Sequence, residues 1–303
     1  MQQRSVRAAG EQISLGGSGY RLQWAVPRGD VIVYGATVWE TGSWMDVAIR
    51  ELYPRIDGIS RAADGSLRVA ASARAAMERA EETLARGQRA EENWLRRCGG
   101  GSRLWEAYGT RYVMRAFPRA PSLQTVLEQG ELPVDAALQV MDQLLEAVSD
   151  LHGQRLLHLE ITPERIYLLP GGRVFLDHRC LWEMDQPGDG EAAGGFLPYA
   201  APEVRLHNLR EIGAAADVYS CCAVLFAMLL GRPIREAEVL SRSLSHAIGC
   251  AFSHQNLPPA AGTALLPILC RGLHTLPHRR FPSAQALRQA LRAAEPKQLC
   301  MEG

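Results

Sequence analysis

The pattern of apolar residues changes once along the chain, and this change limits the folds that the chain can adopt. Up to residue 117, runs such as VIVYGATVW and DVAIREL are rich in β-branched and aromatic residues, a composition that favours strands. From Leu123 onward the apolar residues recur at helical spacing. The clearest series is Leu138, Met141, Leu144, Leu145, Val148 and Leu151. A β-rich first third followed by a helical remainder predicts an α+β chain with two lobes.

Four segments follow from this pattern. We expect an N-terminal arm or linker at 1–19, a strand-rich lobe at 20–117, a helical lobe at 118–295 and a tail at 296–303. The arm is predicted because its sequence is polar and ends in the glycine-rich LGGSG. Within the strand-rich lobe, residues 72–97 have helical spacing that Gly87 interrupts.

Composition excludes several classes of protein. The chain has 303 residues, zero formal net charge and a pI near 7.1, so no basic field favours nucleic acid or an anionic membrane as a partner. The longest apolar run, Val218–Leu230, is too short to span a bilayer. Seven cysteines without CxxC spacing and a first segment without a signal-peptide core predict a reduced, cytoplasmic protein.

Several motifs in a fixed order resemble those of the protein kinase family, over about residues 20–295. They are VAIREL at 47–52, TRYVMRAF at 110–117, HLEITPERIYL at 158–168, APE at 201–203, DVYS at 217–220 and an arginine at 280. This resemblance implies the bilobal fold of the eukaryotic-type protein kinases. It also implies that each residue that phosphoryl transfer needs can be compared with the residue present here.

The glycine-rich loop of the family corresponds to WAVPRGDVIVYGA at 24–36. Glycines in such a loop let backbone N–H groups approach the phosphates. Here the three glycine positions hold Val26, Arg28 and Val31, and only Gly29 stands nearby. We therefore expect side chains to crowd the phosphate site.

The nucleotide-binding lysine of the family is replaced by Arg50, and the only lysine of the chain is Lys297 in the tail. A guanidinium is bulkier than an ammonium and directs its hydrogen bonds differently. We expect Arg50 to pair with a helix glutamate, for which Glu91 fits best and Glu92 and Glu82 are alternatives.

The resemblance also places residues around a nucleotide. Met114 corresponds to the gatekeeper, and the connecting segment Arg115, Ala116 and Phe117 follows it. Together with Gly29, Arg50 and Glu91 these residues would form a degenerate nucleotide site. No cofactor is expected there, although ATP without Mg²⁺ remains open.

The catalytic loop departs from the family at the positions that matter for chemistry. The catalytic aspartate is Glu160, a carboxylate that could still serve as a base but is displaced by one methylene. The Mg²⁺-binding asparagine is Arg165, which places a fixed cation where a metal should bind. We expect Arg165 to pair with Asp177 and to replace the metal.

The DFG segment is ambiguous by one residue. With a gap in the preceding turn it corresponds to Asp177–His178–Arg179, which we prefer, and without the gap it would be His178–Arg179–Cys180. Both alignments lose the glycine.

In the kinase family an arginine binds the phosphate of the activation loop, and Leu159 stands at its position here. The segment 177–203 contains no serine or threonine and one tyrosine, Tyr199. Regulation by phosphorylation is therefore not expected.

The framework residues His158, Glu203, Asp217 and Arg280 are present, whereas residues that phosphoryl transfer requires are replaced. The sequence thus predicts a pseudokinase that serves as an interaction or allosteric module, with another kinase or a domain of a longer protein as partner. The alternative is a divergent Ser/Thr kinase, or another ATP-using transferase of this fold, that employs Arg50, Glu160 and Asp177.

Overall fold

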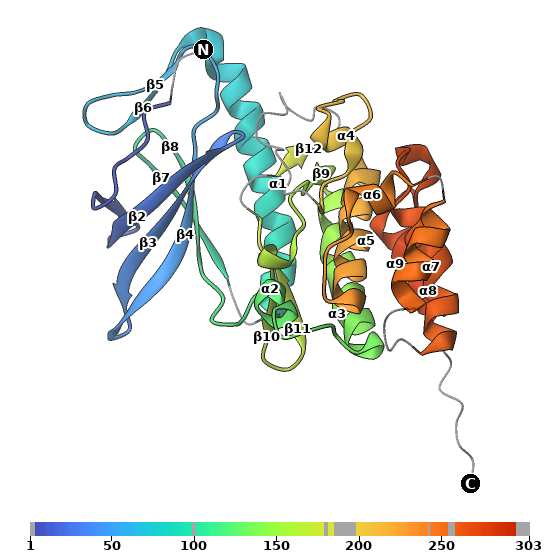
Figure 1. Cartoon of the computed structure of the whole chain (residues 1–303). Helices are drawn as coiled ribbons and strands as arrows, with labels where there is room; N and C mark the ends of the chain where they lie inside the picture. The colour runs from blue at the N-terminus through green and yellow to red at the C-terminus, as the bar shows by residue number, and fades with distance from the viewer. Residues whose placement is uncertain are drawn as a thin grey trace. The chain divides into compact units, whose positions relative to one another are not determined.

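The computed structural model describes residues 4–98, 101–178, 181–184, 198–241, 243–253 and 258–294. The chain divides into two compact units (Figure 1). The first unit comprises the described residues up to Arg119 together with those from His178 to Glu183, and the second unit comprises the rest. Each unit is described by itself below.

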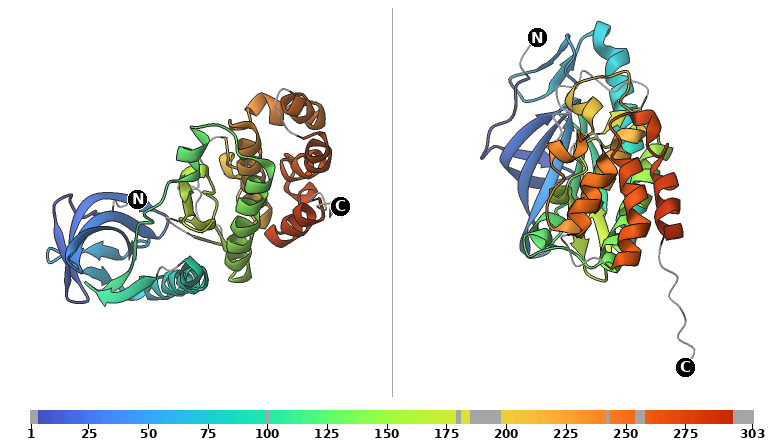
Figure 2. Two further views of the ribbon diagram at one scale, coloured as in Figure 1. Left: turned by 90° about the horizontal axis from the view of Figure 1, so that it is seen from below. Right: turned by 45° about the vertical axis from the view of Figure 1, so that its right-hand side comes forward.

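The first unit is built on a six-stranded antiparallel sheet in the order β1-β2-β3-β4-β8-β7. Its strands are β1 (Gln12–Leu15), β2 (Ser18–Arg28), β3 (Val31–Glu40), β4 (Ser43–Leu52), β7 (Ser102–Ala107) and β8 (Thr110–Ala116). The short strand β12 (Trp182–Glu183) also belongs to this unit. The views in Figure 2 show how strongly the sheet curls.

The central strands are adjacent as the sequence predicts. Strand β4 pairs with β3 on one side and with β8 on the other, so that Arg50 lies opposite both Val33 and Val113. Alternate residues of a strand point to opposite faces of the sheet. Arg50 therefore shares one face with Val33 and Val113, whereas Glu51 lies on the other face.

The predicted arm at 1–19 is wrong in part. Residues Gln12–Leu15 form β1, which pairs with the start of β2 around a turn at Gly16 and Gly17. The polar composition hid the period-two alternation of this strand, whose Ile13 and Leu15 are buried while their neighbours are exposed. LGGSG is thus a hairpin turn and not a linker.

Helix α1 (Arg74–Cys98) lies against the sheet in the first unit (Figure 1). The predicted interruption at Gly87 does not occur, because the helix continues through this residue. A glycine inside a helix costs about 1 kcal/mol relative to alanine, which packing of the helix on the sheet offsets.

A small hairpin, β5 (Ile59–Arg61) with β6 (Leu67–Val69), joins β4 to α1. It is fixed by Glu51, which is fully buried. Arg61 donates two hydrogen bonds to this carboxylate at 2.9 and 2.6 Å, and the hydroxyl of Tyr34 donates a third at 2.7 Å. The charge of Glu51 is therefore compensated inside the first unit.

The second unit is mostly helical. Its helices are α2 (Leu123–Leu127), α3 (Val134–Gly153), α4 (Pro202–Arg205), α5 (Ala214–Leu230), α6 (Glu236–Val239), α7 (Leu244–Ser253), α8 (Pro259–Gly272) and α9 (Ala284–Ala294). Strand β9 (Leu156–Leu157) and the hairpin of β10 (Ile166–Leu169) with β11 (Arg173–Leu176) complete it.

The core of this unit forms around α3 and α5. The face of α3 that the helical spacing predicts is buried, from Leu138 to Leu151. Every residue of α5 from Ala216 to Leu230 is buried, as expected for a helix that is apolar all round. Within the described part of the chain, no helix combines the length and apolar character that a membrane span requires.

Candidate functional site

The first candidate site is a charge cluster in the first unit, centred on Glu91 of α1. The guanidinium of Arg50 donates a hydrogen bond to this carboxylate. Both side chains are buried, Arg50 at 4% and Glu91 at 3% exposure. The pairing with Glu91, predicted ahead of Glu92 and Glu82, is thus present.

A second arginine holds the same carboxylate. Arg115 Nε lies 3.1 Å from Glu91 Oε1, and the side chain of Arg115 is 3% exposed. The register explains this contact: Arg115 lies opposite Ala48, two residues before Arg50 on β4. Arg50 and Arg115 therefore project from the same face of neighbouring strands.

Met114, which corresponds to the gatekeeper in the family alignment, does not share the sheet face of Arg50. Met114 lies opposite Ile49 in the sheet, so it shares the face of Ile49 and not that of Arg50. Arg115 takes the place that the alignment gave to Met114. A shift of one residue in a strand reverses the face of every side chain, and the motif alone did not fix this register.

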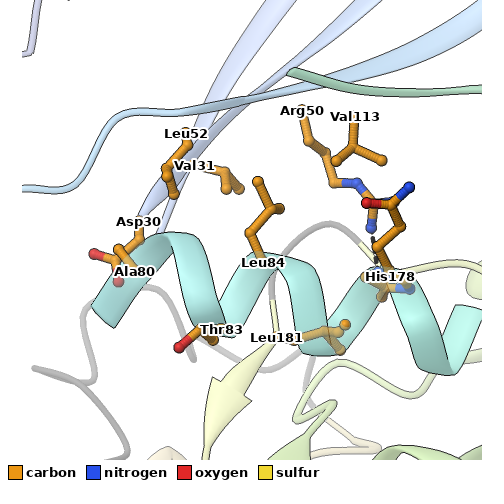
Figure 3. A pocket seen from close by; sticks show the side chains of 12 residues that line it. Asp30, Val31, Arg50, Leu52, Ala80, Thr83, Leu84, Val113, His178 and Leu181 are labelled. Atoms are coloured by element: carbon orange, nitrogen blue, oxygen red, sulfur yellow. Dashed lines mark hydrogen bonds between the residues drawn. The ribbon is translucent and has the colours of Figure 1, made fainter. Parts of the chain in front are cut away.

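His178 completes the cluster. Its Nε2 contacts a terminal nitrogen of Arg50 and lies 3.9 Å from Glu91 Oε2. In Figure 3 the Arg50 side chain points at His178 past Val113, and a dashed line joins the two. With Leu84, these side chains line a pocket of about 40 Å³. The Arg50 guanidinium is therefore directed to protein groups on two sides.

The predicted glycine-rich loop is a tight turn between β2 and β3. Gly29 has φ +46°, a conformation that favours glycine, and its carbonyl oxygen accepts a hydrogen bond of 2.9 Å from Arg4 Nη1. The turn has only two residues, because Arg28 and Val31 still pair. The backbone at this position thus lacks the length of an open loop.

The indole ring of Trp24 lies on the same face of the sheet as Arg50. Trp24 pairs with Gly35, and a Cβ on Gly35 would come within 2.1 Å of the Trp24 ring. The ring of Phe117 lies 6.5 Å from that of Trp24, while Ala116 ends β8 as an exposed residue. No motif pointed to Trp24, although an aromatic residue on a strand next to one that carries a glycine is a usable signal.

The second candidate site lies in the second unit and is described by itself. Arg165 Nη1 is 3.2 Å from Asp177 Oδ2, and Arg165 Nη2 is 3.5 Å from Glu160 Oε2. Arg165 and Asp177 are 7% and 6% exposed. The predicted ion pair is therefore present, and the same guanidinium also neutralises the carboxylate at the catalytic position.

The catalytic loop is anchored on Asp217 of α5. The backbone N–H groups of His158 and Leu159 donate to its two oxygens at 2.9 and 2.7 Å. Leu159 has φ +57°, an uncommon conformation for this residue type. It is retained because the buried carboxylate accepts both N–H groups.

Burial sets the protonation of this anchor. Desolvation lowers the pKa of His158 to about 4, against the opposing charge of Asp217, so the imidazole is neutral at pH 7. Burial alone would raise the pKa of Asp217, but the hydrogen bond from His152 and the nearby imidazoles more than offset it, and the pKa is lowered. Asp217 thus remains ionised.

The second framework contact joins Glu203 of the APE motif to Arg280. Arg280 donates to both oxygens of Glu203, at 2.7 and 2.8 Å, and both residues are buried. The carbonyl groups of Ala215 and Thr275 accept further hydrogen bonds from the same guanidinium. Such a bidentate pair fixes α4 to the segment between α8 and α9.

The activation segment lies largely outside the described residues, and so do Arg179, which both DFG alignments contain, and Cys180, which ends the second alignment. Lys297 is outside them as well. The contact of Asp177 with Arg165 favours the alignment that starts at Asp177. Tyr199 is described and is buried at 7% exposure.

These residues do not fit a divalent metal ion. Mg²⁺ requires carboxylate and neutral oxygen ligands in near-octahedral geometry. Asp177 instead faces the Arg165 cation at 3.2 Å. A guanidinium and a Mg²⁺ ion repel each other at such distances, more strongly where burial lowers the dielectric.

The family model and the relatives that match the chain all belong to one family. The model of the protein kinase domain matches residues 102–290, more than half of the chain. Serine/threonine-protein kinase PksC of Streptomyces coelicolor is 28% identical over 202 residues, which are 61% of this chain and 35% of that protein.

Two further relatives give the same picture. PknA of Corynebacterium glutamicum, a serine/threonine-protein kinase, is 26% identical over 187 residues, 60% of this chain and 39% of that protein. CBL-interacting serine/threonine-protein kinase 26 of Arabidopsis thaliana is 31% identical over 148 residues, 46% of this chain and 34% of that protein. The chain thus spans little more than a third of the length of these relatives.

Proposed function

The chain belongs to the protein kinase domain family, and we propose that it is a pseudokinase, a member that binds another protein and does not transfer phosphate with Mg²⁺. The observation that carries this proposal is the Arg165–Asp177 ion pair at 3.2 Å. A metal ion would have to displace a cation that is tethered to the same unit. The tether gives the arginine a high effective concentration.

The position of the catalytic base supports the same proposal. Glu160 retains a carboxylate, and a divergent kinase could use it to accept a proton. Arg165 lies 3.5 Å from this carboxylate as well. The guanidinium therefore competes with a substrate hydroxyl for this carboxylate. The alternative of an active kinase or other ATP-using transferase therefore has less support.

The Glu91 cluster engages the guanidinium that stands in place of the family's lysine. That lysine pairs with a helix glutamate and also reaches the phosphates, whereas Arg50 contacts His178 in addition to its pair with Glu91. Arg115 adds another cation on the same carboxylate. These three side chains hold Arg50 in place for a structural task, so ATP would have to bind without this group and without Mg²⁺.

The framework, by contrast, is complete. The Glu203–Arg280 pair and the hydrogen bonds to Asp217 are buried and bidentate. A chain that keeps a rigid fold while losing its chemistry is suited to recognition by a protein. We propose another protein kinase, or another domain of a longer protein, as the partner, with no role for nucleic acid or a membrane and with a cytoplasmic location.

A phosphate-transfer experiment tests this function. Purified chain, with Asp177→Ala as the matched control, is incubated with radiolabelled ATP, a general protein substrate and Mg²⁺ or Mn²⁺. We expect equal and negligible transfer by both proteins. Transfer that the substitution abolishes would establish the divergent kinase instead.

A melting experiment separates nucleotide binding from catalysis. A ligand bound well above its Kd stabilises a protein by a few kcal/mol, so ATP alone and ATP with Mg²⁺ are compared. We expect that Mg²⁺ adds nothing to any effect of ATP. The binding role is then tested on a kinase that copurifies from native cells, whose activity should change when the purified chain is added.

A further inference from the structure

A second pocket of the first unit shares no residue with the Glu91 cluster. It measures about 190 Å³ and lies where the N-terminal segment, the residues after β4 and the strand β5 meet. Its polar lining comes from Arg4, Arg55, Arg61, Asp57, Ser5 and Ser60. This volume is far above the roughly 10–15 Å³ that one water requires.

The charges of the pocket favour an anion. Three arginines line it against one acid, Asp57. Arg61 also forms an ion pair with Glu51 at 2.6 Å behind the pocket. Even when Glu51 is included, the three arginines outnumber the two carboxylates. The hydroxyls of the two serines can donate to oxygen atoms of a ligand.

Two of the guanidinium groups are positioned by the backbone. Arg4 Nη1 donates to the carbonyl oxygens of Gly29 and Tyr53 at 2.9 and 2.7 Å. Arg61 Nε donates to the carbonyl oxygen of Ser5 at 2.9 Å, and its guanidinium lies over the Tyr53 ring. These hydrogen bonds hold the two positive charges in position beside the pocket, which lowers the entropy cost of binding an anion there.

From this arrangement we propose that the pocket binds a phosphate group. Guanidinium groups recognise phosphate oxygens through paired N–H donors. Positive charges on three separate segments suit a tetrahedral anion with several acceptor oxygens better than a planar carboxylate. The phosphate can be a free ion or part of a phosphorylated side chain, because the shared chemistry is the same.

The pocket is linked to the turn between β2 and β3. Arg4 holds the Gly29 carbonyl, and Tyr53 N–H donates to the Asp30 carbonyl oxygen at 2.8 Å. Phosphate at Arg4 would therefore act on a residue that also fixes this turn. The inference does not depend on the proposed function, since a phosphate site here is compatible with an active or an inactive kinase.

The test measures binding of two probes, inorganic phosphate and a phosphoserine peptide, by calorimetry and by melting. Sodium chloride at equal ionic strength is the reference. The variant is Arg55→Gln, since Arg55 is exposed and its loss should leave the fold intact. Arg68→Gln is the matched control, an exposed arginine on β6 outside the lining.

We expect saturable binding of phosphate to the native chain and to Arg68→Gln, and about tenfold weaker binding to Arg55→Gln, the loss of one charge-assisted hydrogen bond. Binding of the peptide in the same pattern would identify a phosphorylated side chain as the source. Binding of inorganic phosphate alone would identify the free ion. Equal effects of phosphate and chloride, or equal affinities of the two variants, would overturn the proposal.

Discussion

Arg115 Nε lies 3.1 Å from Glu91 Oε1, on the carboxylate that also binds Arg50. One glutamate of α1 thereby connects to two neighbouring strands, β4 and β8. The contact places a second cation beside the residue that replaces the nucleotide-binding lysine. The contribution of Glu91 to the free energy of unfolding can therefore be measured by substitution.

We predict that Glu91→Gln lowers the free energy of unfolding by about 3–5 kcal/mol, because removing one member of a buried ion pair leaves a buried charge uncompensated. Here two arginines lose their partner. Chemical denaturation of the variant is compared with that of Glu82→Gln, an exposed residue of the same helix. Equal stabilities of the two variants would contradict the prediction.

Arg165→Asn restores a neutral oxygen ligand beside Asp177. We expect Mg²⁺ to raise the melting temperature of this variant, because the cation that competes for the carboxylate is gone. Neither the native chain nor Arg173→Asn, an exposed control on β11, should respond to Mg²⁺. A native chain that Mg²⁺ stabilises as much as the variant would argue that Arg165 does not block the metal.

Arg280→Ala should destabilise the protein by about 3–5 kcal/mol, since Glu203 would remain buried without its bidentate partner. Arg288→Ala is the control. Arg288 also forms a bidentate pair, with Asp142, but this pair is partly exposed and should contribute about 0–1 kcal/mol. Thermal or urea unfolding separates the two values, and similar losses would refute the argument from burial.

Stability should fall in acid because of His158. The pKa of this imidazole is lowered from 6.5 to about 4 by burial, so between these values the unfolded chain binds more protons than the folded one. The free energy of unfolding should therefore decrease as pH falls from about 6.5 to about 4. His158→Gln should lose much of this dependence, whereas the exposed control His246→Gln should keep it. Equal pH profiles would speak against His158.

We predict that the segment 177–203 is not regulated by phosphorylation. Its one hydroxyl-bearing residue, Tyr199, is buried, and burial raises the pKa of its phenol to about 12. Leu159 offers no cation to a phosphate. Phosphopeptide mapping from native cells should find Tyr199 unmodified, and a stoichiometric phosphate there would contradict this.

The sequence by itself determined the order of the elements and the identity of the replaced residues. The spacing of α3 and the apolar run of α5 determined two core helices, because burial of an apolar face requires that periodicity. The resemblance to the kinase motifs also predicted the contact between Arg165 and Asp177, because it assigns both residues to metal-ligand positions.

Tertiary structure decided which side chains meet on the sheet. Glu82, Glu91 and Glu92 are all acidic residues of one helix, and only the docking of α1 selects Glu91 as the partner of Arg50. The register of β8 with β4 determined which side chains of β8 share a sheet face with Arg50. Arg115 shares that face and Met114 does not. Register depends on packing between strands distant in sequence, and that information is absent from any single motif.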